Sequence, residues 1–281
     1  MPLELVEDAM GDPRNAAFLL MACQHAYEAE ERGAALFKDE LGLTAKLISV
    51  DNTQVYVGHN DANVVVAFRG SEGPNSLDGL KDWLLTNALN LLIVPEGKLG
   101  ADFAAAGVGA RFHQGFVSAI TGVWEPLFAE VEALLKAKDR PLWVTGHSLG
   151  GALALLASWL FVRKTVNVHQ TYTFGAPMVG NKDVAQAINR ELPGKIFRYA
   201  NAPDPVPLLP MMSMIANDYL HCDKLVVLGD AGGNANALEF FKQMAGGAAT
   251  GLLHGTLADE FWTAVKGRIA AHMLDDYRKH L

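Results

Sequence analysis

The feature that most constrains the fold is a pentapeptide, Gly146-His147-Ser148-Leu149-Gly150, that stands between two apolar segments. Leu142 to Thr145 has the length and composition of a buried strand, and Leu149 to Val162 has those of an apolar helix. A serine at such a junction occupies a tight turn with strained backbone angles, in which side chains two residues away would collide. Glycines at both of those positions favour this turn, which lifts the Ser148 hydroxyl above a sheet. The alternative is a glycine-rich helix start that Ser148 only caps.

Strands and helices alternate around this unit. Apolar runs predict strands at residues 63–68, 142–145, 168–174, 195–199 and 224–228, and helical spacing predicts helices at 116–138, 149–162 and 182–190. The alternation predicts an α/β fold with a mainly parallel central sheet covered by helices on both faces. Outside it, the sequence predicts a helix over 14–41, a β-hairpin over 47–58, a mobile surface segment over 72–110 and a C-terminal helix at about 256–279.

The chain is predicted to form a single domain over residues 1–281. A stretch rich in glycine and alanine, residues 231–255, is interpreted as an insertion because it carries apolar residues at helical spacing. The net charge of −8 and the lack of a basic run argue against nucleic acid and anionic membrane surfaces as partners.

Two cysteines, Cys23 and Cys222, form neither a metal motif nor a disulfide framework, and we expect two buried apolar side chains. One bridge between them is the alternative. The acidic start, Met1 to Asp8, does not resemble a secretory signal, although a chain whose leader has been removed would look the same. No run reaches the ~20 apolar residues of a transmembrane helix. Compartment and oligomeric state stay open.

A serine in this turn suggests nucleophilic catalysis, which requires two partners. A histidine must take the hydroxyl proton, and a carboxylate must fix the tautomer of that histidine. In sheets of this kind both partners follow the serine along the chain. The backbone N–H of Leu149, at the start of a helix, is placed to stabilise developing negative charge. His147 is expected to pack beside the turn, because adjacent residues there diverge.

Asp204 is the strongest candidate for the carboxylate. It lies just past a predicted strand, between Pro203 and Pro205, where loops at the carboxyl ends of parallel strands form the site. An ordinary Asp-Pro turn is the alternative. The weaker candidates, none of which directly follows a strand in a rigid loop, are Asp183, Asp218, Asp223 and Asp230.

Five histidines follow Ser148. His169 begins a strand, at the wrong end of the sheet, and His280 is next to the chain terminus. His221 precedes a strand and is more easily explained as structural. His254 and His272 are left, and the pattern alone does not separate them.

Taken together, several motifs resemble the class 3 lipase family, the fungal-type triacylglycerol lipases and their bacterial relatives. The resemblance covers roughly residues 45–228 and a C-terminal segment, and it rests on Val65 to Ser71, His113 to Phe116, Val144 to Ala154, Thr173 to Asn181, Asp204 to Pro207, and His272 with Tyr277. It implies an α/β-hydrolase fold and the hydrolysis of acyl esters through an acyl-enzyme, with no metal or organic cofactor.

The resemblance also implies individual roles. Ser148 matches the nucleophile, Asp204 the acid and His272 the base, which favours His272 over His254. Ser71 matches the first residue of the oxyanion hole, and the Leu149 N–H is the second donor.

The resemblance also implies a lid over residues 72–94, which would cover the site in water and turn its apolar face to lipid. The apolar residues of this segment fit such a lid, and a core helix with its connecting loop is the alternative. The prediction is therefore a lipase whose substrate is an acyl ester or lipid, bound at an oil–water interface if the lid opens there. A carboxylesterase, a phospholipase or a feruloyl-type esterase would use the same triad. A catalytically inactive binding scaffold is the remote alternative.

Overall fold

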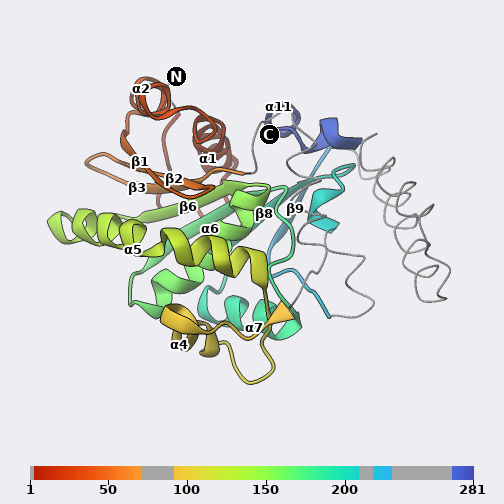
Figure 1. Cartoon of the computed structure of the whole chain (residues 1–281). Coiled ribbons are helices and arrows are strands. Elements are labelled where there is room, and N and C mark those ends of the chain that lie inside the picture. The colour runs from red at the N-terminus through yellow and green to blue at the C-terminus, as the bar shows by residue number, and fades with distance from the viewer. Residues whose placement is uncertain (1–2, 71–91, 209–217, 230–267) are drawn as a thin grey trace.

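A seven-stranded sheet forms the centre of the computed structural model, which describes residues 3–70, 92–208, 218–229 and 268–281 (Figure 1). The strands run in the order β1-β2-β3-β6-β7-β8-β9. Their bounds are β1 Thr44–Val50, β2 Thr53–His59, β3 Val64–Phe68, β6 Leu142–His147, β7 Val168–Phe174, β8 Ile196–Asn201 and β9 Leu225–Leu228. Pairing is antiparallel between β1 and β2 and between β2 and β3, and parallel from β3 to β9. The predicted mainly parallel sheet and the hairpin at its edge are confirmed.

Helices cover both faces of this sheet (Figure 1). On one face lie α1 Pro13–His25, α2 Glu30–Leu41 and α11 Leu274–His280, and on the other α5 Gln114–Ala137, α6 Leu149–Arg163 and α7 Lys182–Glu191. The five residues of β3 are all buried, and they alternate between the two cores: Val64, Val66 and Phe68 face α5 and α6, and Val65 and Ala67 face α1. Burial on both faces explains why the central strands are continuous apolar runs.

The single helix predicted over residues 14–41 is wrong. The chain forms two helices, and Ala29 between them is extended, with φ −63° and ψ 158°. No proline or glycine marks the break. Tertiary contacts hold it instead: the Tyr56 hydroxyl donates to the carbonyl oxygens of Glu28 and Glu30 at 3.2 and 3.4 Å, and the Tyr27 hydroxyl contacts His147. The bond to Glu28 satisfies a carbonyl group that lies in the break between the two helices.

The prediction of a continuous C-terminal helix at 256–279 is also wrong in its described part, residues 268–279. A 3₁₀ helix, η3 Ile269–His272, is followed by an extended residue, Met273 (φ −69°, ψ 143°), and then by α11. In an unbroken helix two residues five positions apart would face about 140° away from each other at 3.6 residues per turn. The break lets His272 and Tyr277 reach the same carboxylate oxygen of Asp204.

The prediction of a mobile surface segment over residues 72–110 is wrong in its described part, residues 92–110, which forms regular elements. The short strand β4 Leu92–Ile93 pairs with β5 Phe112–His113, and η1 Gly97–Leu99 and α4 Gly100–Ala104 follow β4. Leu99, Phe103 and Ala106 are buried in the core beneath α6 and α5. Most of the predicted lid (72–91) and the whole predicted insertion (231–255) lie outside the described residues.

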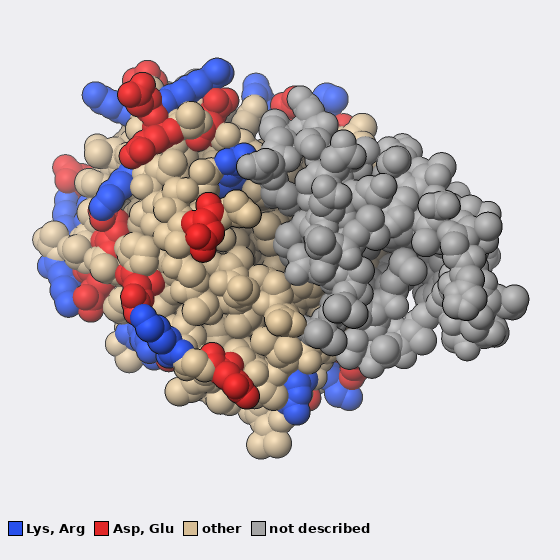
Figure 2. Space-filling model, in the orientation of Figure 1, with Lys and Arg blue, Asp and Glu red and all other residues tan. Residues whose placement is uncertain are grey.

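Both cysteines are free and buried, as expected, and burial raises the pKa of the Cys23 thiol to about 12. Positive and negative side chains alternate over the described part of the surface that Figure 2 presents. Ion pairs such as Lys46–Glu130 and Lys98–Glu125 join them. Among the helices that the structure describes, none has the length and apolar character needed to cross a bilayer.

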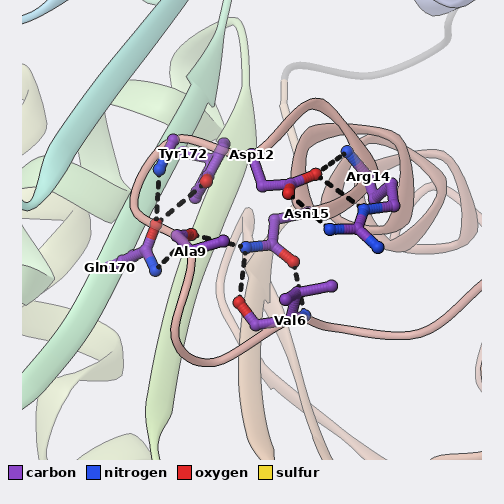
Figure 3. A network of polar contacts seen from close by, with 8 residues as sticks. Val6, Ala9, Asp12, Arg14, Asn15, Gln170 and Tyr172 are labelled. Carbon is purple, nitrogen blue, oxygen red and sulfur yellow. Dashed lines mark hydrogen bonds and ion pairs between the residues drawn. The ribbon is translucent and has the colours of Figure 1, made fainter.

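The N-terminal segment is fixed to the domain by buried amide side chains (Figure 3). Asn15, which is fully buried, donates from Nδ2 to the carbonyl oxygens of Val6 (3.0 Å) and Ala9 (3.2 Å), and its Oδ1 accepts from the Val6 amide at 2.7 Å. On β7, Gln170 Oε1 accepts from the Gly11 amide and from the Tyr172 hydroxyl. The network therefore attaches the segment before α1 to both α1 and the central sheet.

Replacing Asn15 by leucine is expected to lower the free energy of unfolding by about 2–4 kcal/mol, because the Val6 amide and the Val6 and Ala9 carbonyl oxygens lose their hydrogen bonds to this buried side chain. Urea denaturation followed by circular dichroism measures the change. The control is Arg14→Leu, at the position next to Asn15. It removes the exposed ion pair between Arg14 and Asp12 and should change stability little. Equal stabilities of the two variants would contradict a structural role for the Asn15 network.

Candidate active site

Ser148 occupies the turn between β6 and α6 with φ +56° and ψ −129°. Its side chain does not cap α6, and its backbone N–H donates to the carbonyl oxygen of Phe174 at 2.9 Å. A non-glycine residue at positive φ is strained, and such strain often marks a functional position. The strand–turn–helix unit predicted from the pentapeptide is therefore present, and the helix-cap interpretation of Ser148 is not.

The glycines that flank Ser148 allow backbones to touch. A Cβ atom on Gly146 would overlap the carbonyl oxygen of Gly150, and one on Gly150 would overlap that of Phe68 at the end of β3. Leu149 is the first residue of α6, so its N–H belongs to the first turn, where backbone donors have no partner within the helix. The turn thus brings the start of α6 against the end of β3, the strand that leads to Ser71. Ser71 itself lies outside the described residues.

Asp204 and His272 lie in direct contact. Asp204 follows β8, its side chain is completely buried, and its Oδ2 lies 2.9 Å from Nδ1 of His272. The Asp204 Oδ1 accepts from the Val206 amide at 2.9 Å. Because Nδ1 donates to the carboxylate, the other ring nitrogen, Nε2, carries the lone pair. This Nε2 is buried and has no hydrogen-bond partner among the residues that the structure describes.

The Asp204–His272 pair lies beside the Ser148 turn. The His272 ring is 4.6 Å from that of His147, centroid to centroid, and its carbonyl oxygen is 2.8 Å from His147 Nε2. Gly175 has a φ of +60°, and a Cβ there would come within 2.8 Å of both Asp204 Oδ2 and His272 Cε1. Gly175 directly follows Phe174, which holds the Ser148 amide. Residues 147–148, 174–175 and 204, from the carboxyl ends of β6, β7 and β8, thus meet His272 from the C-terminal segment.

The other candidates in the described residues are engaged elsewhere. His221 Nε2 contacts the Pro207 carbonyl oxygen at 2.5 Å, and burial, followed by the Arg198 charge, lowers the pKa of His221 to about 3. His169 contacts the Glu7 carbonyl at the opposite end of β7, and His280 faces Asp276. Asp218 pairs with Lys182.

Asp183 belongs to α7, and the Asp223 amide is bound by Asn189. His254 and Asp230 lie outside the described residues. Of the candidates that can be compared, only Asp204 and His272 come together.

Two tyrosines at the site were not assigned from the sequence. The Tyr277 hydroxyl donates to Asp204 Oδ2 at 2.6 Å and accepts from the Asn201 amide at 3.1 Å. Burial, and then the Asp204 charge, hold the pKa of Tyr277 well above its usual value, so the hydroxyl keeps its proton. Tyr27 contacts His147 at 2.8 Å. The motif that contains His272 and Tyr277 pointed to His272 as the base and assigned no role to Tyr277. Nothing in the sequence indicated a role for Tyr27.

Replacing Tyr277 by phenylalanine should lower both stability and activity. The Asp204 carboxylate loses a charge-assisted hydrogen bond, which typically contributes about 1.5–3 kcal/mol. We expect a loss of about 2 kcal/mol in the free energy of unfolding, measured in urea, and a lower kcat. Tyr199→Phe is the matched control, because Tyr199 packs in the same apolar cluster and stacks on Tyr172. If both variants lose the same stability, the bond to Asp204 contributes nothing specific.

The fold and the site define the class of protein. A mainly parallel sheet with helices on both faces and a strained serine turn at the end of a central strand is an α/β-hydrolase. The chain belongs to the class 3 lipase family, whose sequence pattern matches residues 65–214, more than half of the chain.

Curated relatives include secreted mono- and diacylglycerol lipases of fungi and a phospholipase A(1) of Arabidopsis thaliana. The protein of Malassezia globosa is 31% identical over 160 residues, which cover 56% of this chain and 50% of the relative. That of Fusarium solani is 34% identical over 162 residues, 55% of this chain and 42% of the relative. The chain therefore spans half or less of the length of these relatives. Among solved structures, a triacylglyceride lipase of Rhizomucor miehei superposes with a TM-score of 0.59 at 23% identity, covering 79% of this chain and 82% of that one, which shows a common fold.

Proposed function

We propose that this protein hydrolyses carboxylic esters of acylglycerols, with Ser148 as nucleophile, His272 as base and Asp204 as the acid that orients the base. The observation that carries the proposal is the buried 2.9 Å contact between Asp204 Oδ2 and His272 Nδ1, beside a serine in a strained strand–helix turn. Family membership and the acylglycerol lipases among the relatives support the choice of substrate.

The proposed reaction has two acyl-transfer steps. Ser148 Oγ attacks the ester carbonyl while its proton passes to His272 Nε2, which then gives that proton to the departing alcohol. Water next attacks the acyl-enzyme, with His272 Nε2 taking its proton and returning it to Ser148 as the fatty acid leaves. Asp204 stays ionised throughout, because it stabilises the imidazolium. The chemistry uses only these side chains and needs no metal or organic cofactor.

Negative charge builds on the carbonyl oxygen in both steps. The Leu149 N–H, at the first position of α6, and the Ser71 N–H and hydroxyl are the proposed donors. Preorganised donors of this kind are effective because they need no reorientation during the reaction, and losing one typically costs ~10²–10³ in rate. The proximity of the Ser148 turn to the end of β3 supports a position for Ser71 near the reacting carbonyl.

The lipid specificity of the proposal is tested by a hydrolysis profile over ester chain length, with and without an oil–water interface. Soluble butyrate esters are compared with emulsified triolein, and Ser148→Ala preparations supply the background. A jump in rate above the solubility limit of the substrate supports a lipase whose segment 72–94 acts as a lid. A preference for soluble esters with no such jump would favour a carboxylesterase or feruloyl-type esterase, and preference for phospholipid vesicles a phospholipase. Absence of hydrolysis together with no reaction with serine-directed probes would indicate an inactive scaffold.

A further inference from the structure

The phenol of Tyr27 lies among the segments that form the site. Its hydroxyl lies 2.8 Å from Nδ1 of His147. The Gly70 backbone packs against the same hydroxyl, which a Cβ atom on Gly70 would overlap. On the other side of the His147 ring, Nε2 lies 2.8 Å from the carbonyl oxygen of His272. Tyr27 comes from the break between α1 and α2, which the sequence pattern did not predict.

The directions of these hydrogen bonds follow from the groups that make them. A carbonyl oxygen only accepts, so His147 Nε2 must carry a hydrogen and donate it to His272. Burial, and then the neighbouring His272, hold the pKa of His147 well below its usual value, so its ring is neutral. A neutral ring protonated at Nε2 has its lone pair at Nδ1, which must accept from the Tyr27 hydroxyl. Tyr27 therefore donates to His147, and His147 donates to the His272 backbone.

These contacts involve residues that belong to, or directly precede, groups that the proposed function uses. Gly70 directly precedes Ser71, His147 directly precedes Ser148, and His272 itself receives the last bond. We propose that Tyr27 is a positioning residue that holds the Gly70 backbone, the nucleophile turn and the backbone of the base in one register, through its hydrogen bond to His147. The inference rests on the proposed function. It also assigns a role at the site to the segment between α1 and α2. This segment lies before residues 65–214, the part of the chain that the family pattern matches.

This positioning needs a hydroxyl rather than a ring. Without the Tyr27 hydroxyl, the His272 carbonyl still favours the Nε2–H tautomer of His147, but the buried Nδ1 loses its donor. The His147 ring is then held at one nitrogen only and can tilt, which moves the His272 backbone that Nε2–H contacts. Small displacements of a catalytic group cost rate even where substrate binding is kept.

Tyr27→Phe tests this by steady-state kinetics on a soluble butyrate ester. We expect kcat to fall about tenfold with KM nearly unchanged, because the ring is kept and only the alignment of the base is lost. Tyr56→Phe is the matched control, since Tyr56 donates to Glu28 and Glu30 in the same inter-helix segment, and it should retain wild-type kcat. Wild-type kcat in Tyr27→Phe, or an equal loss in both variants, would overturn the inference.

A second readout does not depend on activity. In histidine-¹⁵N-labelled protein, wild type should show His147 as the neutral Nε2–H tautomer. Tyr27→Phe should keep this tautomer but shift the Nδ1 resonance, because the Nδ1 lone pair loses the hydrogen bond from the hydroxyl. An unchanged Nδ1 resonance in the variant would overturn the inference. Because this spectrum is measured without substrate, it also separates failure of the inference from failure of the proposed function, in which wild type would hydrolyse no ester.

Two replacements of His147 test the last bond. The amide of glutamine is placed near the position of Nε2 and can still donate to the His272 carbonyl, whereas asparagine is placed near Nδ1 and cannot. We expect His147→Gln to keep a kcat about tenfold above that of His147→Asn, in proteins whose melting temperatures are compared alongside. Equal kcat values in the two folded variants would contradict the role of this bond.

Discussion

Ser148→Ala is expected to lower kcat for soluble esters by about 10⁴-fold or more, to the background of the assay. The hydroxyl is the only group at the strained turn that can form the acyl-enzyme, so nothing replaces it. Alanine has the same backbone restrictions as serine at a φ of +56°, and the Ser148 side chain does not cap α6. The variant should therefore fold with wild-type stability, which circular dichroism and thermal denaturation will check.

Ser158→Ala is the matched control for that loss. Ser158 is also buried and lies on α6, the helix that follows Ser148, where its hydroxyl donates to the Ala154 carbonyl and contacts Thr171. Its removal should affect stability more than activity. Retention of more than a few per cent of turnover by Ser148→Ala, beyond what a contaminating esterase explains, would refute its assignment as nucleophile.

Asp204→Asn has the second largest expected effect, a loss of about 10³–10⁴ in kcat. The Asp204 carboxylate accepts from Val206, His272 and Tyr277 at once, so both of its oxygens are in use. An amide of the same shape must present an N–H₂ group to one side. Where that N–H₂ group faces His272 Nδ1, Nδ1 must accept, so the ring takes the Nε2–H tautomer. Nε2 can then no longer accept a proton from Ser148.

Asp276→Asn provides the comparison for Asp204→Asn. Asp276 lies on α11, and its carboxylate accepts from the same Asn201 side chain that contacts Ala271, without contacting His272. Its kcat should stay within a few-fold of wild type. If Asp204→Asn behaves in the same way, the carboxylate does not orient the base, and another acid must be sought.

Much of this architecture could be predicted from the sequence because it depends on local patterns. Strand β3 is a continuous apolar run that ends at turn residues, and Gly146 is required by a collision with Gly150, four residues away. Asp204 could be ranked first among the carboxylates because it follows β8 directly, between two prolines.

The parts that could not be predicted depend on contacts between distant residues. The breaks at Ala29 and Met273 contain no proline or glycine, and each is stabilised by a partner far away in the chain, Tyr56 for the first and Asp204 for the second. The choice between His254 and His272 needed a family resemblance, because which histidine reaches Asp204 depends on the path of the whole C-terminal segment. Tyr27 had no signal for the same reason, since its role exists only once α1, β3 and β6 are packed together.

The central claim is that one hydroxyl, at the tip of the β6–α6 turn, is activated for attack on an acyl carbon. Its most direct test is reaction of the wild-type protein with a fluorophosphonate, followed by peptide mapping by mass spectrometry. A single adduct on Ser148, formed much more slowly in His272→Ala than in wild type, is the predicted result. An adduct on a different serine, or equal labelling of Ser148→Ala, would contradict it.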